Sequence, residues 1–543
     1  MSGTEGPLLV DTGRGHTVFF QGRHLYSRYD PARIPEETVT REHILPETLV
    51  LCISPVLGYG LEKLLASLPA GCAVVSVERD QELFNLSCTA IPQSVHQHPL
   101  FTNQCVDICS NLETLIEDLP GFPFRRCVRL DLSAGSALYQ DFYTSLTAHV
   151  DSLISVYWKN RVTLMQLGRN YFRNFFINLA LLPASSPLTP YSVHKAILIL
   201  ASGPSLLDGL HFARKHRDML FILAVDTAMP ALREAGITPD ACIILESQFW
   251  IEDSLLGWKN SRIPIFADLT ALPRAIGATG GPVSFFFTHF TRSHTLSRFM
   301  NTSFVPPTMQ RLGSVALTTV SIARKIAESS LPVFFAGLDF SWGNGYTHAQ
   351  GTSPVVRIQN ETNRIRSLAL AGIKENTRKV SGKNGTPYTT DETLLRYAAL
   401  CREQAAGMQG VFDIGQSGLS TGYPNLTLVE ADALVASIPC RQDATCTTEP
   451  QQPDKIDGKD IAAFLKAEQQ RILEIRSRLT GEYQEHSDAE ERTTLLSKIA
   501  ECDYLFLHFP DGHKGVGREQ NFLNRVRVET EYFYKLFAQR VLG

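Results

Sequence analysis

Residues 196–226, AILILASGPSLLDGLHFARKHRDMLFILAVD, decide the fold of the central part of the chain. An apolar run at 196–201 meets a turn of small residues, a segment with helical spacing follows, and a second apolar run at 220–225 ends at Asp226. Such short apolar runs on either side of an amphipathic segment predict a strand, a helix and a second strand. The sequence therefore predicts a β-α-β unit of a parallel sheet.

The turn Gly203-Pro204-Ser205 is the first candidate ligand site of this unit. Proline in the first turn of a helix costs no hydrogen bond, and the Ser205 hydroxyl would lie beside backbone N–H groups that lack helical partners. These groups and the helix dipole would face an anion, such as a phosphate, at the carboxyl end of the strand. Neither G-x-G-x-x-G nor a Walker A motif is present, and a purely structural turn is the simpler interpretation of this motif alone.

Composition excludes several classes of function. The chain has 543 residues, of which 44% are hydrophobic and 20% charged, and its net charge of −4 gives no basis for general nucleic-acid binding. None of its 11 cysteines lies in a C-x-x-C pair, so we expect free thiols and no zinc site. No apolar run of about 18 residues and no signal segment occur, so we expect a cytoplasmic protein that does not span a membrane.

The alternation of apolar runs and helical patterns predicts an α/β protein with four regions. In chain order, these are a β-rich N-terminal segment with a Rossmann-like domain (1–133), a helical bridge with a linker (134–190), a central Rossmann-like α/β domain (191–445), and a linker followed by C-terminal helices (446–543). In the first domain, Gly58 and Gly60 follow one predicted strand and Glu78 closes the next. This pattern fits either a nucleotide site or a purely structural Rossmann-like domain.

In the central domain, polar residues follow successive predicted strands and begin predicted helices. They are Asp226 and Thr227, Glu246, the helix start Gly313-Ser314, and Asp339 with His348 on one later loop. Because the carboxyl ends of parallel strands share one edge of a sheet, we expect these residues to line a common crevice. The sequence therefore places the densest set of candidate catalytic groups at this edge.

The chain resembles the motility accessory factor family, the flagellin glycosyltransferases whose central domain is related to the 6-hydroxymethylpterin diphosphokinase MptE-like domain. The pieces that carry the resemblance keep the family's order and spacing: Gly203-Pro204-Ser205, Val225-Asp226-Thr227-Ala228, Gly236-Ile237-Thr238-Pro239-Asp240, Gly313-Ser314-Val315-Ala316, and Gly337-Leu338-Asp339 followed by Thr347-His348-Ala349. In the N-terminal region, 25–31 and 58–60 also look like this family's leading domain. The resemblance implies a central domain that is also similar in fold to bacterial sialyltransferases.

The resemblance implies transfer of a nonulosonic acid, of pseudaminic or legionaminic type, from its CMP-activated form to serine or threonine of flagellin in the cytoplasm. It implies a role in flagellar assembly and motility, with flagellin and the nucleotide sugar as partners and no tightly bound cofactor. One departure is Glu246-Ser247, which stands where many relatives carry an aspartate followed by proline. This difference bears on donor or acceptor binding.

Under this hypothesis, each candidate residue has a chemical role. The CMP moiety would bind at two predicted helix N-termini and at the end of one predicted strand. The helix N-termini are Gly203-Pro204-Ser205 and Gly313-Ser314, and the strand end is Asp226-Thr227. Asp339 or Glu246 is the candidate base for the acceptor hydroxyl, and His348 the candidate acid or phosphate partner, because imidazole exchanges a proton near neutral pH. No metal ligand is expected.

Two alternatives remain open at this point. A pyrophosphokinase that acts on a pterin would use ATP and Mg²⁺, and Asp226 and Asp339 would then be metal ligands. A non-catalytic flagellin-binding assembly factor with a degenerate site is the other alternative, since no D-x-D metal motif follows a predicted strand.

Overall fold

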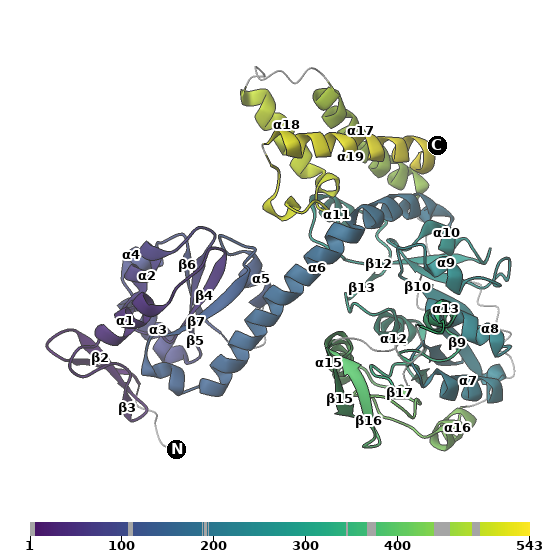
Figure 1. Cartoon of the computed structure of the whole chain (residues 1–543), viewed down its shortest axis with the longest axis horizontal. Helices are drawn as coiled ribbons and strands as arrows, with labels where there is room; N and C mark the ends of the chain where they lie inside the picture. Colours follow the sequence, from purple (N-terminus) through teal and green to yellow (C-terminus); the bar gives the residue numbers. More distant parts are fainter. Residues whose placement is uncertain are drawn as a thin grey trace. The chain divides into compact units, whose positions relative to one another are not determined.

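The computed structural model describes residues 6–106, 112–186, 188, 193, 195–343, 346–365, 376–438, 457–480, 489–517 and 519–542 (Figure 1). The chain forms two compact units, residues 1–164 and 165–543, which we describe separately. Helix α6 (Gln140–Leu181) contributes its first part to one unit and its last part to the other. The predicted helical pattern between the two α/β regions is therefore a single long helix.

The first unit contains a parallel sheet with the strand order β6-β5-β4-β7. Its strands are β4 (Thr48–Ile53), β5 (Ala73–Glu78), β6 (Phe101–Cys105) and β7 (Arg126–Asp131). The helices of this unit besides α6 are α1 (Arg33–Arg41), α2 (Leu61–Ser67), α3 (Gln81–Ala90), α4 (Gln93–His96) and α5 (Leu112–Glu117). A small antiparallel sheet of β1 (Leu8–Asp11), β2 (His16–Phe20) and β3 (Arg23–His24) precedes them.

Both faces of the four-stranded sheet are covered. Side chains alternate along a strand, so Leu51 of β4 packs in one core with Phe142 and Leu146 of α6, while Val50 packs on the other face with Leu64 of α2. A parallel sheet with helices on both faces is the Rossmann-like arrangement predicted for this region.

The second unit is built on an eight-stranded sheet with the order β13-β12-β11-β10-β9-β8-β14-β17, in which all neighbours are parallel. Its strands are β8 (Ala196–Leu200), β9 (Leu220–Val225), β10 (Ala241–Ile244), β11 (Ile265–Asp268), β12 (Val283–Thr288), β13 (Thr308–Met309), β14 (Val333–Ala336) and β17 (Val411–Asp413). The α/β fold and the β8-α7-β9 unit predicted from residues 196–226 are confirmed.

The strand order reverses between β8 and β14. From β8 the chain adds β9 to β13 on one side, and it then returns to add β14 and β17 on the other. Helix α7 (Leu206–Lys215) packs on β8 and β14, and α12 (Val315–Ile326) packs on β8, β9 and β14. Ligands of open α/β sheets bind in the crevice at such a switch point, so the topology places a candidate site at the carboxyl ends of β8 and β14.

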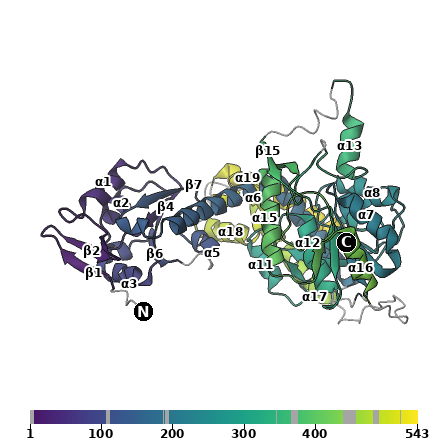
Figure 2. The same ribbon diagram turned by 90° about the horizontal axis from the view of Figure 1, so that it is seen from below.

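Among the described residues, the remaining helices of the sheet region are mostly short connections. They are α8 (Met229–Glu234), α9 (Ile251–Ser254), α10 (Pro273–Ile276), α11 (His294–Met300), α13 (Ser353–Glu361), α15 (Glu392–Ala406) and α16 (Leu428–Ala436). A hairpin of β15 (Thr377–Ser381) and β16 (Pro387–Asp391) leads into α15, which Asp391 caps through the N–H of Leu394. Helix α15 lies beside α12, which it contacts through Gln404 (Figure 2).

The last part of α6 is tied to the sheet by buried asparagines. The Asn174 amide donates to the carbonyl oxygens of Ser247 and Thr270, which follow β10 and β11. The Asn178 amide donates to two further carbonyl oxygens, on either side of Thr270. These side chains are a polar seam that fixes the loops after β10 and β11, rather than ligand contacts.

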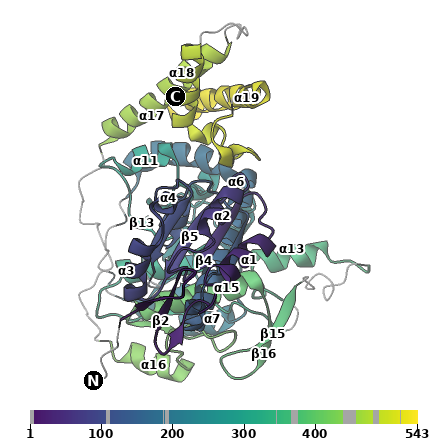
Figure 3. The same ribbon diagram turned by 90° about the vertical axis from the view of Figure 1, so that its left-hand side faces the viewer.

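The C-terminal helices α17 (Gly458–Thr480), α18 (Ala489–Glu501) and α19 (Gln520–Leu536) gather beside α11 (Figures 1 and 3), as expected for a helical C-terminal region. Most of the predicted linker before them lies outside the described residues. Arg298 of α11 donates two hydrogen bonds of 2.9 Å to the fully buried carboxylate of Glu468 on α17, and a third to the carbonyl oxygen of Glu501. Among the described helices, none is long and apolar enough to cross a membrane.

The Arg298–Glu468 pair yields a first prediction. Glu468→Ala removes the buried carboxylate that accepts two hydrogen bonds from Arg298, and we expect this loss to lower the free energy of unfolding by about 3–5 kcal/mol. Urea denaturation followed by circular dichroism measures this change. Glu531→Ala is the control, because its pair with Arg476 is partly exposed and is worth about 1 kcal/mol or less. Equal losses in the two variants would contradict the prediction.

Candidate functional site

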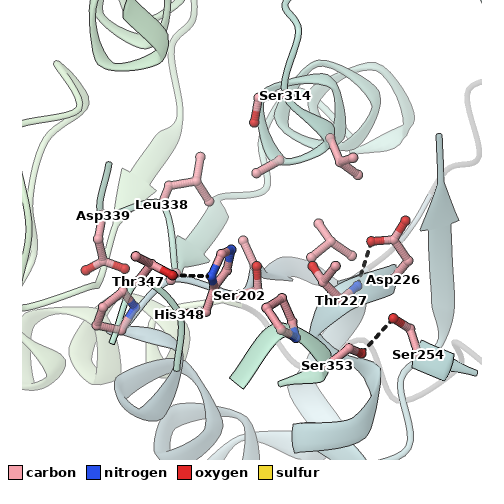
Figure 4. Close-up of a pocket in the computed structure, with 18 of the residues that line it drawn as sticks. Ser202, Asp226, Thr227, Ser254, Ser314, Leu338, Asp339, Thr347, His348 and Ser353 are labelled. Atoms are coloured by element: carbon pink, nitrogen blue, oxygen red, sulfur yellow. Dashed lines mark hydrogen bonds between the residues drawn. The ribbon is translucent and has the colours of Figure 1, made fainter. Parts of the chain in front are cut away.

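A cavity of about 450 Å³ opens at the carboxyl ends of β8, β9, β10 and β14 (Figure 4). It is lined by most of the residues that the sequence singled out, namely Gly203, Pro204, Asp226, Thr227, Glu246, Ser314, Asp339 and His348. Two predicted residues, Ser205 and Gly313, are not among the lining residues. The chain thus brings the ends of four strands together at the topological switch point.

Ser205 and Asp339 join the loops that follow β8 and β14. The backbone N–H and the hydroxyl of Ser205 both donate to Asp339 Oδ2, each over 3.0 Å. The same hydroxyl accepts the N–H of Gly337 over 2.9 Å. Ser205 and Asp339 are 3% and 2% exposed, so these bonds lie within the protein rather than in solvent.

Close backbone approach at this point requires glycine. A Cβ atom at Gly203 would lie 2.3 Å from Asp339 Oδ2 and 2.5 Å from the carbonyl oxygen of Gly337. Gly337 has a φ of +88°, and its Cβ would lie 2.2 Å from the carbonyl oxygen of Ala201. The Gly203 and Gly337 of the family pattern therefore serve the packing of these two loops.

The expectation that Ser205 offers free donors to a phosphate needs correction. Its hydroxyl and its N–H are both engaged by Asp339, and the N–H of Leu206 bonds the carbonyl oxygen of Gly203. The sequence could not reveal this, because Asp339 lies 134 positions further along the chain. Gly203 and Pro204 remain on the cavity wall, with Ser205 behind them.

Asp339 lines the cavity, but both of its carboxylate oxygens carry hydrogen bonds. Oδ1 accepts the hydroxyl of Ser417 over 2.8 Å, and Oδ2 is bonded by Ser205. Burial raises the pKa of Asp339 to about 6, and the bonds from Ser205 and Ser417 and the charge of Lys383 limit this rise. These contacts give Asp339 a structural role, and its action as a base stays a prediction.

A second carboxylate, Asp226, is held at the end of β9. Its Oδ1 accepts the N–H of Thr227 over 2.6 Å, as Figure 4 shows, while its buried Oδ2 has no hydrogen-bond partner. Burial, together with the charge of Glu246, raises the pKa of Asp226 to about 7. Glu246 is half-buried at the end of β10, and its Oε1 accepts the N–H of Gln248 over 2.9 Å.

The other side of the cavity offers hydrogen-bond donors. His348 Nδ1 and the hydroxyl of Thr347 lie 2.9 Å apart on the loop after β14. Ser314 precedes α12 without making a side-chain capping bond, and Val315 and Ala316 also line the cavity. The first turn of α12 is therefore a helix N-terminus that favours an anion here, as is the start of α13 at Ser353 and Pro354.

Sequence reasoning missed one wall of the cavity, which α9 and α13 form. Ser254 and Ser353 share a hydrogen bond of 2.7 Å between their hydroxyl oxygens (Figure 4). One helical turn away, the guanidinium of Arg357 lies 4.8 Å from the centre of the Trp250 ring. The two serines are 99 positions apart, so no local pattern in the sequence could pair these helices.

The carboxylate at the end of β5 in the first unit is not available to a ligand. Glu78 is fully buried, and burial raises its pKa to about 8. Asp80 caps α3 through the N–H groups of Glu82 and Leu83, and its other oxygen accepts the hydroxyl of Tyr139. Of the two interpretations of this domain, the structural one fits these contacts better.

Comparison with known sequences finds one domain family and a full-length relative. Residues 169–345 match the family described as 6-hydroxymethylpterin diphosphokinase MptE-like. A protein of Treponema pallidum (strain Nichols), described as uncharacterized, is 33% identical over 98% of this chain and 95% of its own length. A second protein of that organism is 26% identical over 34% of this chain and 42% of its own length.

Among solved structures, the chain resembles the MAf glycosyltransferase from Magnetospirillum magneticum AMB-1. The TM-score is 0.57 with 13% sequence identity, and the alignment covers 99% of this chain and 92% of that one. At this identity, the similarity describes the fold.

The Ser205–Asp339 contact yields a second prediction. Ser205→Ala removes the hydroxyl that bonds Asp339 and Gly337, and we expect a loss of about 1–3 kcal/mol in the free energy of unfolding. Urea denaturation measures this loss. Ser202→Ala is the matched control, since Ser202 lies on the cavity wall and we expect a change within about 0.5 kcal/mol. A Ser205→Ala protein as stable as the control would refute the structural role of this hydroxyl.

Asp226 yields a third prediction. Because its pKa is raised from 3.8 to about 7, the folded state binds more protons than the unfolded state between these values, and this contribution to stability falls as the pH rises through 7. Asp226→Asn keeps an acceptor for Thr227 and removes the charge. We expect the variant to gain up to about 4 kcal/mol over the natural protein at pH 8, and little at pH 4.

Urea denaturation at several pH values measures the difference for Asp226→Asn. Asp218→Asn, at an exposed position, is the control and should show no such trend. A gain that is the same at pH 4 and pH 8 would contradict the buried charge as its cause.

Proposed function

We propose that this chain, whose residues 169–345 match the MptE-like family and whose fold resembles that of a MAf glycosyltransferase, is itself a glycosyltransferase. The observation that carries this proposal is the cavity at the switch point between β8 and β14. It combines carboxylates, an imidazole, a guanidinium and the N-terminus of α12 within about 450 Å³. These are the groups that transfer of a sugar from a nucleotide donor requires.

The proposed donor is a CMP-activated nonulosonic acid of pseudaminic or legionaminic type, and the acceptor is a serine or threonine of flagellin. This donor and acceptor are those of the family that the sequence resembles. In the reaction, the acceptor oxygen forms a bond to the anomeric carbon as the bond between that carbon and the phosphate oxygen breaks. CMP leaves with the bonding electron pair, and the proton of the acceptor hydroxyl passes to a base of the protein.

The residues of the cavity can be assigned to these steps. The N–H groups of the first turn of α12, beside Ser314, would hold the phosphate of CMP, which the helix dipole favours. His348 would bind or protonate that phosphate as its negative charge grows. Glu246, which is half-buried and lines the cavity, and Asp339 are the candidate bases.

A pyrophosphokinase is the second candidate, because the MptE-like match covers 169–345 and includes Asp226 and Asp339. ATP would then replace CMP, and these two carboxylates would hold Mg²⁺ against its phosphates. The bonds that Asp339 already makes to Ser205 and Ser417 favour the transferase over this alternative.

A fourth prediction separates the candidate functions. Isothermal titration calorimetry of the full chain with CMP and with ATP, each with and without Mg²⁺, measures which nucleotide the cavity prefers. We expect CMP to bind without a need for metal, and His348→Ala to weaken that binding. Preference for ATP only with Mg²⁺ would instead support the pyrophosphokinase, and binding of neither nucleotide would support a non-catalytic assembly factor.

A further inference from the structure

Arg357 is the one lysine or arginine among the described residues that line the cavity. Three carboxylates line the same cavity, namely Asp226, Glu246 and Asp339. The groups of the lining that favour an anionic donor include the guanidinium of Arg357 and the N-termini of α12 and α13, with the imidazole of His348 as a further hydrogen-bond partner. The position of Arg357 in the cavity therefore decides which acidic group of a ligand its guanidinium can contact.

The Arg357 side chain is held in place by α9. Its Nη2 donates to Asp253 Oδ2 over 3.2 Å, and its guanidinium lies over the ring of Trp250 at 4.8 Å. The hydrogen bond between Ser353 and Ser254 joins α13 to α9 one turn before Arg357. A guanidinium that is already ordered by such contacts loses less conformational entropy when it binds a ligand.

These contacts leave donors of the guanidinium available. Its five N–H groups are matched by one hydrogen bond to Asp253, whose side chain is 57% exposed. The Arg357 side chain itself is 40% exposed. Exposed ion pairs of this kind are weak, so a ligand carboxylate that binds through two parallel hydrogen bonds can compete with Asp253.

The place of Arg357 separates it from the proposed phosphate site. Figure 4 shows Ser353, one turn before Arg357, on the opposite side of the pocket from Ser314 at the start of α12. A ligand whose phosphate binds at α12 would thus present a different part of its structure to α13. The flat guanidinium matches a planar carboxylate. Trp250 beside it is 44% exposed, and its ring contacts both Arg357 and Phe249.

We propose that Arg357 binds the carboxylate of an acidic sugar donor, with Trp250 beside it, and thereby selects a nonulosonic acid over neutral sugars. This inference rests on the proposed glycosyltransferase function. It assigns the choice of sugar to α9 and α13, and the binding of the nucleotide to the loops after β8 and β14 and to α12.

The test compares two probes, CMP and CMP-N-acetylneuraminic acid, which differ by the acidic sugar. Calorimetry is done on the full-length natural protein and on Arg357→Gln, Arg357→Lys and the control Arg274→Gln. Arg274 pairs with Glu252 of α9 at 3.5 Å, is 79% exposed, and does not line the cavity. Circular dichroism melting curves establish that each variant is folded.

We expect Arg357→Gln to weaken binding of CMP-N-acetylneuraminic acid by about 10- to 100-fold, the usual range for loss of a hydrogen bond between charged groups. Binding of CMP should change by less than about twofold, Arg357→Lys should be intermediate, and Arg274→Gln should resemble the natural protein.

Two results would overturn the role of Arg357 alone: equal weakening of both probes, or unchanged binding of CMP-N-acetylneuraminic acid by Arg357→Gln. Natural protein that binds CMP as tightly as the sugar donor would also overturn it, since no sugar contact would then contribute. Natural protein that binds neither probe would instead overturn the proposed transferase, and the role of Arg357 with it.

Discussion

The hydrogen bonds between Ser205 and Asp339 are the constraint on which the rest of the site depends. They join two strand-end loops that leave neighbouring strands, β8 and β14, at the point where the strand order reverses. The loops approach so closely that Gly203 and Gly337 have no room for a side chain. Because this contact uses the donors of Ser205 internally, Ser205 does not offer them to a ligand of the cavity.

The proposed anionic donor would meet buried carboxylates in the cavity. Burial raises the pKa of Asp226 to about 7, so this carboxyl group of the wall is partly protonated near physiological pH, while the pKa of Asp339, raised to about 6, leaves that group mostly ionised. Arg357 and the N-terminus of α12 supply positive charge at separate places. The proposed donor, which has a phosphate and a carboxylate, would meet these two places with different groups.

Local sequence patterns predicted much of this arrangement. The strands β8 and β9 and the helix between them follow from short-range periodicity, which a single sequence displays. The hydrogen bonds from Ser205 to Asp339, and the hydrogen bond between Ser254 and Ser353 that pairs α9 with α13, join residues about a hundred or more positions apart in the sequence. Periodicity carries no information about such partners, so Arg357 and Trp250 were missed.

Both parallel sheets of the chain contain a point where the strand order reverses, but the loops at these two points are packed differently. In the first unit the order also reverses, between β4 and β7, yet Ser54 and Glu78 at this edge are fully buried. A Cβ atom at Gly135 would lie 2.1 Å from Ser54 Oγ, so the loops after these strands are packed against each other. In the second unit α9, α12 and α13 stand around the corresponding edge and enclose a cavity. A reversal of strand order therefore places loops where a ligand can bind, and the segments that surround these loops decide whether a cavity forms there.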